Sequence, residues 1–254
     1  MAEFIKIEND GQVPKITLDR PKHNVLDIPM MNELNAELEK IAADNELKCV
    51  VLTGEGRSFC AGVEVGDHKP DQVDEMVAVF NRIFELINRI DIPVIAAVNG
   101  ACLGGGMEVA IACDIVIASE KAIFGQPEIK LGFFPPYAAI RLPELVGPAK
   151  AIEILTTGQN YSALESKDLG FVSQVASVDD FEDVVQKQIK QITMASPLII
   201  RLNKRAVKRH IGTGFAQSVD LVSDYFLNTL MKTEDTLEGI ASFEEKRRPT
   251  WKNK

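Results

Sequence analysis

The apolar stretch from residue 92 to residue 118 constrains the fold more than any other part of the sequence. It is long enough for a membrane-spanning helix, but it contains Asn99, Glu108 and Asp114 and is broken by the three glycines at 104–106. Polar and charged side chains are costly inside lipid. We therefore interpret the stretch as the buried core of a folded protein and expect no membrane partner.

The sequence around this core alternates between strand and helix patterns. Apolar and polar residues alternate on both sides of the Asn9-Asp10-Gly11 turn, which is typical of a β-hairpin. Further on, apolar residues form short buried runs or recur with the helical period. We expect strands over residues 4–8, 13–18, 49–53, 94–98 and 114–119, and helices over 30–43, 107–113 and from 73 to the stop at 91–93. This order indicates an α/β layer architecture.

After about Gly147 the pattern changes, and we expect helices alone. The expected helices cover residues 149–157, 163–169, 181–195, 198–208, 215–231 and 234–245. The 254 residues suit one large domain or two small ones, and the sequence contains no internal repeat and no low-complexity linker. We therefore expect an α/β core over 1–195 and a helical region over 196–254 that packs on this core or on a neighbouring subunit.

Charge and cysteine usage exclude several classes of protein. Lys and Arg number 28 and Asp and Glu 37, so the net charge of -9 disfavours nucleic acid as a partner. The four cysteines form no CxxC pair, and the first residues contain no apolar stretch of signal-peptide length. The three histidines lack metal-ligand spacing. We expect a cytoplasmic protein without a disulfide framework, metal site or other resident cofactor.

Two glycine-rich turns are candidates for binding an anion. The turn at 100–106 lies between a buried strand and a helix, where backbone N–H groups at the helix N-terminus can bind a phosphate or an oxyanion. It matches neither a Walker A loop nor a dinucleotide fingerprint. A second turn at 57–64 follows the strand over 49–53 and could direct another N–H group into the same space. The alternative is that both are ordinary tight turns.

Two glutamates are candidates for acid/base chemistry. Glu108 lies in an otherwise apolar run, and Glu128 follows 20 positions later. An apolar environment raises the pKa of a carboxyl group, which can then act as an acid or a base near neutral pH. The alternative is that Glu108 is a first-turn residue favoured by the helix dipole and that Glu128 belongs to a surface loop.

Five segments resemble the enoyl-CoA hydratase/isomerase (crotonase) superfamily in order, spacing and identity. They are SFCAGV (58–63), GACLGGGMEVA (100–110), ACDI (112–115), FGQPEIKLG (124–132) and EGIASFEEKRRP (238–249). The resemblance covers nearly the whole chain. It implies an α/β fold of the crotonase (ClpP-like) type, in which a spiral of ββα units is followed by a helical C-terminal region that mediates trimerisation, commonly as a dimer of trimers. It also implies an acyl-CoA ligand.

The resemblance also implies roles for particular residues. The backbone N–H groups of Val63 and Gly105 match the oxyanion hole that binds the thioester oxygen, and Ala61 matches a substrate-binding position. Glu108 and Glu128 match the two glutamates of the hydratases, with Glu108 chiefly activating water and Glu128 chiefly delivering the proton. Isomerases of this family generally need one acid/base residue, so the pair favours an acyl-CoA hydro-lyase.

Three segments show a closer resemblance to one group within the family. The sequences VGDHKPDQ (65–72), GFFPPYAA (132–139) and EEKRRPTWKN (244–253) are similar to the cyclohexa-1,5-diene-1-carbonyl-CoA hydratases of anaerobic benzoyl-CoA degradation, a route of aromatic hydrocarbon catabolism. Phe133, Phe134 and Tyr137 could form a flat wall that binds a six-membered ring, or they could simply fill the core. The resemblance implies a product of 6-hydroxycyclohex-1-ene-1-carbonyl-CoA. The alternative is a straight-chain enoyl-CoA hydratase of fatty-acid β-oxidation.

Overall fold

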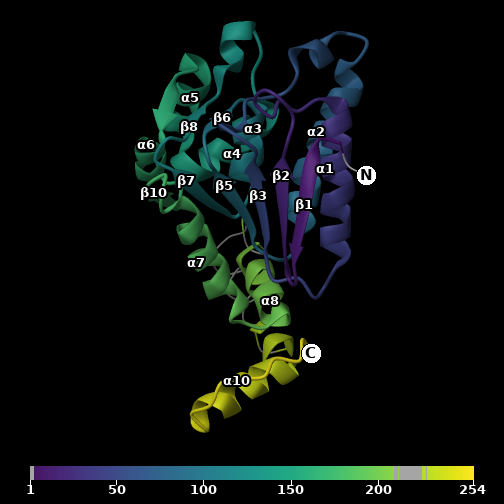
Figure 1. Ribbon diagram of the computed structural model, residues 1–254, viewed down its shortest axis with the longest axis vertical. Helices are drawn as coiled ribbons and strands as arrows, with labels where there is room; N and C mark the ends of the chain where they lie inside the picture. Colours follow the sequence, from purple (N-terminus) through teal and green to yellow (C-terminus); the bar gives the residue numbers. More distant parts are fainter. Residues whose placement is uncertain (1–2, 209–210, 212–224, 227) are drawn as a thin grey trace.

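The larger of two β-sheets contains six strands and forms the centre of the molecule (Figure 1). The computed structural model describes residues 3–208, 211, 225–226 and 228–254. The strand order is β1 (Ile5–Asp10), β2 (Val13–Leu18), β3 (Val50–Gly54), β5 (Val94–Val98), β7 (Ile115–Ser119) and β10 (Gln174–Ala176). The β1–β2 pair is the predicted antiparallel hairpin, and Gly11 in its turn has a φ of 59°. The remaining pairs are parallel.

A smaller four-stranded sheet lies beside the first. Its order is β4 (Ser58–Cys60), β6 (Ala101–Leu103), β8 (Ile123–Gly125) and β9 (Asn160–Ser162). The chain enters the large sheet at β3, the small one at β4 and then forms a helix, and it repeats this path at β5 and β6. Each of these two turns of the chain contributes one strand to each sheet and one helix, which confirms the expected spiral of ββα units.

Three helices cover the part of the core that contains the apolar stretch. They are α1 (Ile28–Ala43), α2 (Val73–Arg89) and α3 (Gly105–Ala112). Helix α1 begins at Asp27, whose Oδ1 accepts a hydrogen bond from the N–H of Met30 at 3.0 Å. Helices α1 and α2 run side by side along one flank of the large sheet (Figure 1). Helix α3 is buried along almost its whole length, so the stretch over 92–118 is protein core, as expected.

The expectation of helices alone after Gly147 is wrong at two places. Strand β9 pairs antiparallel with β8, and β10 extends the large sheet beside β7. Each has only three residues, which is too short for a period to be recognised, and the neighbouring strand rather than the local sequence makes it a strand. Helix α4 (Pro136–Val146) ends just before Gly147. The other described elements after Gly147 are α5 (Pro148–Thr157), α6 (Ala163–Asp168), α7 (Phe181–Thr193), α8 (Pro197–Lys208), η3 (Leu230–Lys232) and α10 (Glu234–Glu244). The helix expected over 215–231 falls largely outside the described residues.

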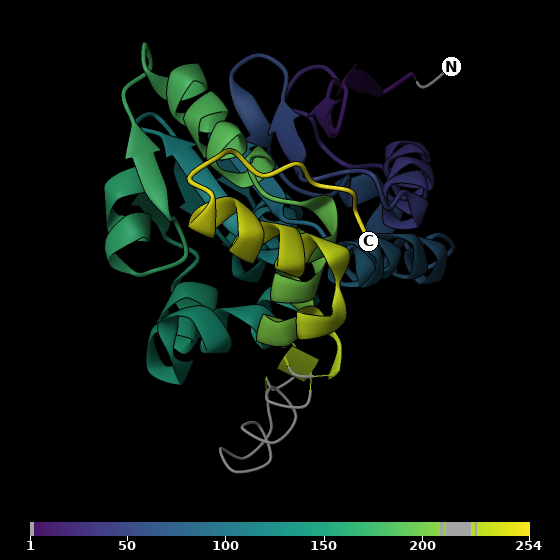
Figure 2. The same cartoon turned by 90° about the horizontal axis from the view of Figure 1, so that it is seen from below.

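The C-terminal segment lies at one end of the molecule, beyond α8 (Figures 1 and 2). Helix α8 is joined to the core by Lys204, whose Nζ donates to the carbonyl oxygen of Ile92 at 2.7 Å and pairs with Asp114. After α10 the chain turns back, and Asn253 Nδ2 donates to Glu46 Oε1 at 2.7 Å. Within the described part of the chain, no helix is long and apolar enough to cross a membrane.

Candidate active site

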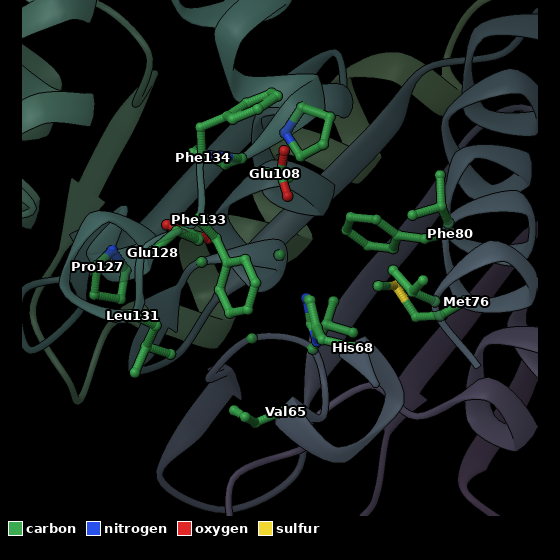
Figure 3. Close-up of a pocket in the computed structure, with 18 of the residues that line it drawn as sticks. Val65, His68, Met76, Phe80, Glu108, Pro127, Glu128, Leu131, Phe133 and Phe134 are labelled. Carbon is green, nitrogen blue, oxygen red and sulfur yellow. The ribbon is translucent and has the colours of Figure 1, made fainter. Parts of the chain in front are cut away.

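A cavity of about 380 Å³ lies between α2, the N-terminus of α3 and two short helices, η1 (Val65–His68) and η2 (Pro127–Leu131) (Figure 3). Its wall is largely apolar. Seven of the eight residues selected from the sequence line it: Ala61, Val63, Gly105, Glu108, Glu128, Phe133 and Phe134. The fold therefore brings together residues from both glycine-rich turns and both candidate glutamates.

The Gly62–Val63 peptide group is held so that its carbonyl oxygen and its N–H group have different surroundings. Gly62 O accepts a hydrogen bond from the N–H of Leu26 at 2.9 Å and another from Cys60 Sγ at 3.4 Å. The thiol acts as the donor because burial raises the pKa of Cys60 to about 12. Among the residues that the structure describes, none accepts a hydrogen bond from the N–H of Val63. That N–H group is available to a ligand in the cavity.

Gly105 supplies the second backbone donor. It is the first residue of α3, where N–H groups have no partner within the helix, and in the described chain nothing accepts a hydrogen bond from it. A Cβ atom at Gly105 would lie 2.6 Å from Val63 Cγ2, so the two donor residues are in contact. Two N–H groups, one of them at a helix N-terminus, can stabilise negative charge on an oxygen atom.

Glu108 is a buried carboxyl group held by the next helix in the chain. Its side chain is 2% exposed, and Oε1 accepts a hydrogen bond from the N–H of Ala138 at 2.9 Å, in the first turn of α4. Burial raises the pKa of Glu108 to about 7; the negative charge of Glu128 raises it as well, and the hydrogen bond from Ala138 opposes the shift. Glu108 therefore exchanges a proton near neutral pH.

Glu128 lies in η2, and burial raises its pKa to about 7 as well. The Gln126 side chain is fully buried, and in the amide orientation that satisfies its hydrogen bonding Nε2 lies 3.1 Å from both carboxylate oxygens of Glu128. A Cβ atom at Gly104 would lie 2.7 Å from Glu128 Oε1. The carboxylate is thus confined from two sides. Sequence reasoning missed Gln126, and its place two residues before Glu128 was the signal that could have indicated it.

The two glutamates form a coupled pair. Because the charge of one raises the pKa of the other, the second proton is removed less readily than the first, and the pair titrates as a unit. With both values near 7, one carboxyl group can be ionised while the other is protonated. One base and one acid in the same cavity are what the addition of water to a double bond needs.

The structure differs from the sequence analysis at Tyr137. Phe133 and Phe134 line the cavity and are 40% and 72% exposed, but Tyr137 does not line it. The Tyr137 ring stacks on Phe84 of α2, with centroids 3.9 Å apart and an interplanar angle of 8°. The reason is that Pro135 and Pro136 begin helix α4 instead of a turn. In the first turn of that helix, Tyr137 packs into the core between α2 and α4.

The chain is similar to known proteins over nearly its whole length. The family described as Enoyl-CoA hydratase/isomerase matches residues 8–254. A putative enoyl-CoA hydratase/isomerase of Bacillus subtilis, YngF, is 36% identical over 243 residues, which is 93% of each chain. The cyclohexa-1,5-dienecarbonyl-CoA hydratase of Thauera aromatica is 33% identical over 249 residues, covering 98% of this chain and 96% of that one. The crystal structure of an enoyl-CoA hydratase from Bacillus anthracis superimposes with a TM-score of 0.94 at 32% identity, over 99% of this chain and all of that one.

The fold and the site define an enzyme that acts on acyl-CoA thioesters. The chain belongs to the enoyl-CoA hydratase/isomerase family and is an enzyme of the hydratase type. The expected crotonase fold is confirmed by the solved structures that it matches.

Proposed function

We propose that this enzyme adds water to a double bond conjugated to a CoA thioester, using Glu108 and Glu128 as the base and acid. The observation that supports this most directly is a combination of groups in one cavity. The buried Glu108 and the half-buried Glu128 both have pKa values raised to about 7, and two backbone N–H groups have no hydrogen-bond acceptor in the described part of the chain. An isomerase moves a proton from carbon to carbon and needs one such carboxyl group, whereas hydration has to activate a water molecule as well.

Each group has one part in the proposed reaction. The water oxygen forms a bond to the β carbon while its proton passes to the Glu108 carboxylate. Electrons from the double bond move to the thioester oxygen, where the N–H groups of Val63 and Gly105 stabilise the enolate charge. A donor of this kind is worth roughly 3 to 4 kcal/mol where one has been removed from other enzymes. Glu128 then gives its proton to carbon, and a proton passing from Glu108 to Glu128 restores the pair.

We further propose that the acyl group is a cyclic diene, so that cyclohexa-1,5-diene-1-carbonyl-CoA becomes 6-hydroxycyclohex-1-ene-1-carbonyl-CoA in anaerobic benzoyl-CoA degradation. The Phe133 and Phe134 rings beside the carboxyl groups support a flat substrate. The similarity to the Thauera aromatica enzyme supports the same substrate. The reaction is a 1,4-addition, in which the proton goes to the far end of the conjugated system.

The second candidate is hydration of a straight-chain enoyl-CoA in fatty-acid β-oxidation. It is favoured by the relatives of similar identity, such as the Bacillus subtilis protein, that are described as enoyl-CoA hydratases without a cyclic substrate. The mechanism is unchanged, except that the proton goes to the α carbon. The two candidates therefore differ only in how the cavity accommodates the acyl group.

The test compares purified wild-type enzyme with Glu108→Gln and Glu128→Gln, using the loss of conjugated-thioester absorbance and the mass of the product. Both variants are expected to fold and to lose roughly 10²- to 10⁴-fold in kcat, the range for removing an acid/base group. The exposed Glu75→Gln serves as the matched control. Rates near those of the wild type in either active-site variant would refute the two-carboxylate mechanism. Faster turnover of crotonyl-CoA than of the cyclic dienoyl-CoA would refute the cyclic substrate.

Assembly and location form the last part of this proposal. We propose a homotrimer or a dimer of trimers in which the C-terminal region contacts a neighbouring subunit, because Val207 of α8 and Leu237 and Ile240 of α10 are 61%, 56% and 47% exposed. Light scattering that gives a monomer mass would refute it. A cytoplasmic location is supported by four cysteines that are all free thiols. Cell fractionation tests this location.

A further inference from the structure

His68 and Phe133 meet across the cavity. His68 is the last residue of η1, and Phe133 follows η2 on the opposite wall. Their ring centroids are 5.0 Å apart with an interplanar angle of 34°. Both residues line the cavity, and in Figure 3 their rings lie between Glu108 above and Val65 below. Within this one cavity, the contact therefore lies between the Glu108 carboxyl group and the exposed Val65.

The His68 ring is fixed in its position. Its Nδ1 lies 3.0 Å from the carbonyl oxygen of Glu64, and since a carbonyl oxygen can only accept, Nδ1 donates. The loop around it is also anchored, because Asp67 Oδ2 accepts a hydrogen bond from the N–H of Ile28 at 3.0 Å and Arg20 pairs with Glu64 at 3.6 Å. The ring is thus a fixed part of the wall rather than a freely rotating surface side chain.

The two sides of the contact have different surroundings. On the inner side lie Met76 and Phe80 of α2, which are 4% and 6% exposed, together with the buried carboxyl group of Glu108. On the outer side, Val65 and Leu131 are 57% and 60% exposed. The His68–Phe133 contact therefore lies between the buried end of the cavity, here called the acyl chamber, and the exposed rim at Val65 and Leu131. The acyl chamber is not closed at Phe134, which lines the same cavity and is 72% exposed. An acyl group that extends from the chamber towards Val65 and Leu131 has to displace one of the two rings.

We propose that the His68–Phe133 contact is the specificity-determining wall of the acyl chamber, which admits a compact group such as a six-membered ring and excludes an extended chain. The inference rests on the proposed hydratase function and specifies the shape of the acyl group at the same site. A wall of this kind acts by steric exclusion, so its removal enlarges the range of substrates and leaves the chemistry of the glutamates unchanged.

The test measures kcat/KM for crotonyl-CoA, trans-dec-2-enoyl-CoA and the cyclic dienoyl-CoA. In His68→Ala, the ratio of decenoyl to crotonyl activity is expected to rise by about tenfold or more, the lower limit for discrimination by the size of an apolar pocket. His68→Phe keeps a ring against Phe133 and is expected to keep the wild-type ratio. The exposed Asp71→Ala serves as the control within the same segment.

A double-mutant cycle tests whether the His68–Phe133 contact itself sets the ratio of decenoyl to crotonyl activity. Phe133→Ala is expected to raise the ratio as His68→Ala does, and the double variant no further than the larger single effect, since both remove the same contact. Binding of saturated decanoyl-CoA and butyryl-CoA, measured by calorimetry, should show the same change without turnover.

Two results would overturn the inference. In the first, the ratio of the long to the short thioester in His68→Ala, in activity and in binding, stays within about twofold of the wild-type ratio. A change of that size is well below the discrimination that the size of a pocket can give. The other is a His68→Phe variant that changes as much as the alanine variant. An enzyme that binds these thioesters with the expected size dependence but hydrates none of them would refute the proposed function and leave the wall in place. An unchanged ratio in an active enzyme refutes only the wall.

Discussion

Replacing Gly104 by alanine adds one methyl group close to the Glu128 carboxylate, the proposed acid. Gly104 precedes α3 with a φ of 53° and a ψ of -132°. Side chains other than that of glycine rarely adopt this conformation, and holding one in it costs about 1 to 3 kcal/mol. The new Cβ atom would also lie 2.7 Å from Glu128 Oε1. Gly104→Ala therefore affects both stability and the site.

The structure gives the size of the second effect. Ordinary contacts of a Cβ atom begin near 3.4 Å, so the carboxylate oxygen has to move by about 0.7 Å. A misplacement of about 1 Å at a reacting group can reduce the rate by roughly 10²-fold. We expect kcat to fall by roughly 10- to 100-fold, with a smaller change in KM, because the N–H groups of Val63 and Gly105 remain in place.

The assay combines steady-state hydration kinetics with urea unfolding of Gly104→Ala and Gly11→Ala. Gly11 has a φ of 59° in the β1–β2 turn, and a Cβ atom there would have nothing within 4 Å. Gly11→Ala is expected to lose about 1 to 2 kcal/mol of unfolding free energy and no activity. If Gly104→Ala folds and keeps its kcat within about threefold of the wild type, the displacement of the Glu128 carboxylate does not limit the rate and the expected link between displacement and kcat is wrong.

The contacts described above lead to four further predictions. Because burial raises the pKa of Glu108 and of Glu128 to about 7, kcat/KM should peak near that pH, falling on the acid side as the base is protonated and on the alkaline side as the acid ionises. Between pH 4.5 and pH 7 the folded protein keeps a proton on Glu108 that the unfolded chain has lost. The free energy of unfolding should therefore fall as pH rises from about 4.5 to about 7. Urea unfolding of Glu108→Gln should show a shallower fall. Cys60→Ala removes the thiol that donates to the carbonyl oxygen of Gly62, on the same peptide group as the N–H of Val63. It should lower kcat by roughly threefold with little change in KM. The stretching frequency of the bound thioester carbonyl should also shift less than it does in the wild-type enzyme. Lys204→Met should lower the unfolding free energy by roughly 1 to 2 kcal/mol, measured in urea, since the partly exposed Asp114 loses its cationic partner and keeps the hydrogen bond from the N–H of Val94.

Elements with a strong local pattern could be predicted from the sequence. Helices α1 and α2 repeat apolar residues with the helical period, and β5 follows directly after Pro93. Strand β10 could not be predicted in this way, because its three residues become a strand only beside β7. Helix α4 was missed because the Pro135-Pro136 pair is typical of a turn as well as of a helix start.

The residues of the candidate site also fall into two groups, those that local structure brings together and those that only the complete fold brings together. Gly105 and Glu108 lie on one turn of one helix, so their proximity follows from local structure. Val63 and Glu128 come from other turns of the spiral, and only the resemblance to a family placed them beside that helix. The contact of Cys60 with Gly62 is encoded by no local pattern, and only the place of Gln126 two residues before Glu128 could have indicated that partner. Tyr137 was assigned to the site because it is close in sequence to Phe133, although the start of a helix turns its ring towards Phe84.

The four buried cysteines make the opening of this molecule measurable without an introduced label. Alkylating reagents react with thiolates. Burial raises the pKa of Cys49 and Cys60 to about 12, so each thiol reacts only after local unfolding exposes it to solvent. Cys49 packs against the large sheet with Val51 and Ile95, whereas Cys60 donates to the carbonyl oxygen of Gly62 in the turn at 57–64 beside the cavity. Pulsed alkylation read by mass spectrometry would therefore report separate opening free energies for the sheet and for the loops around the cavity.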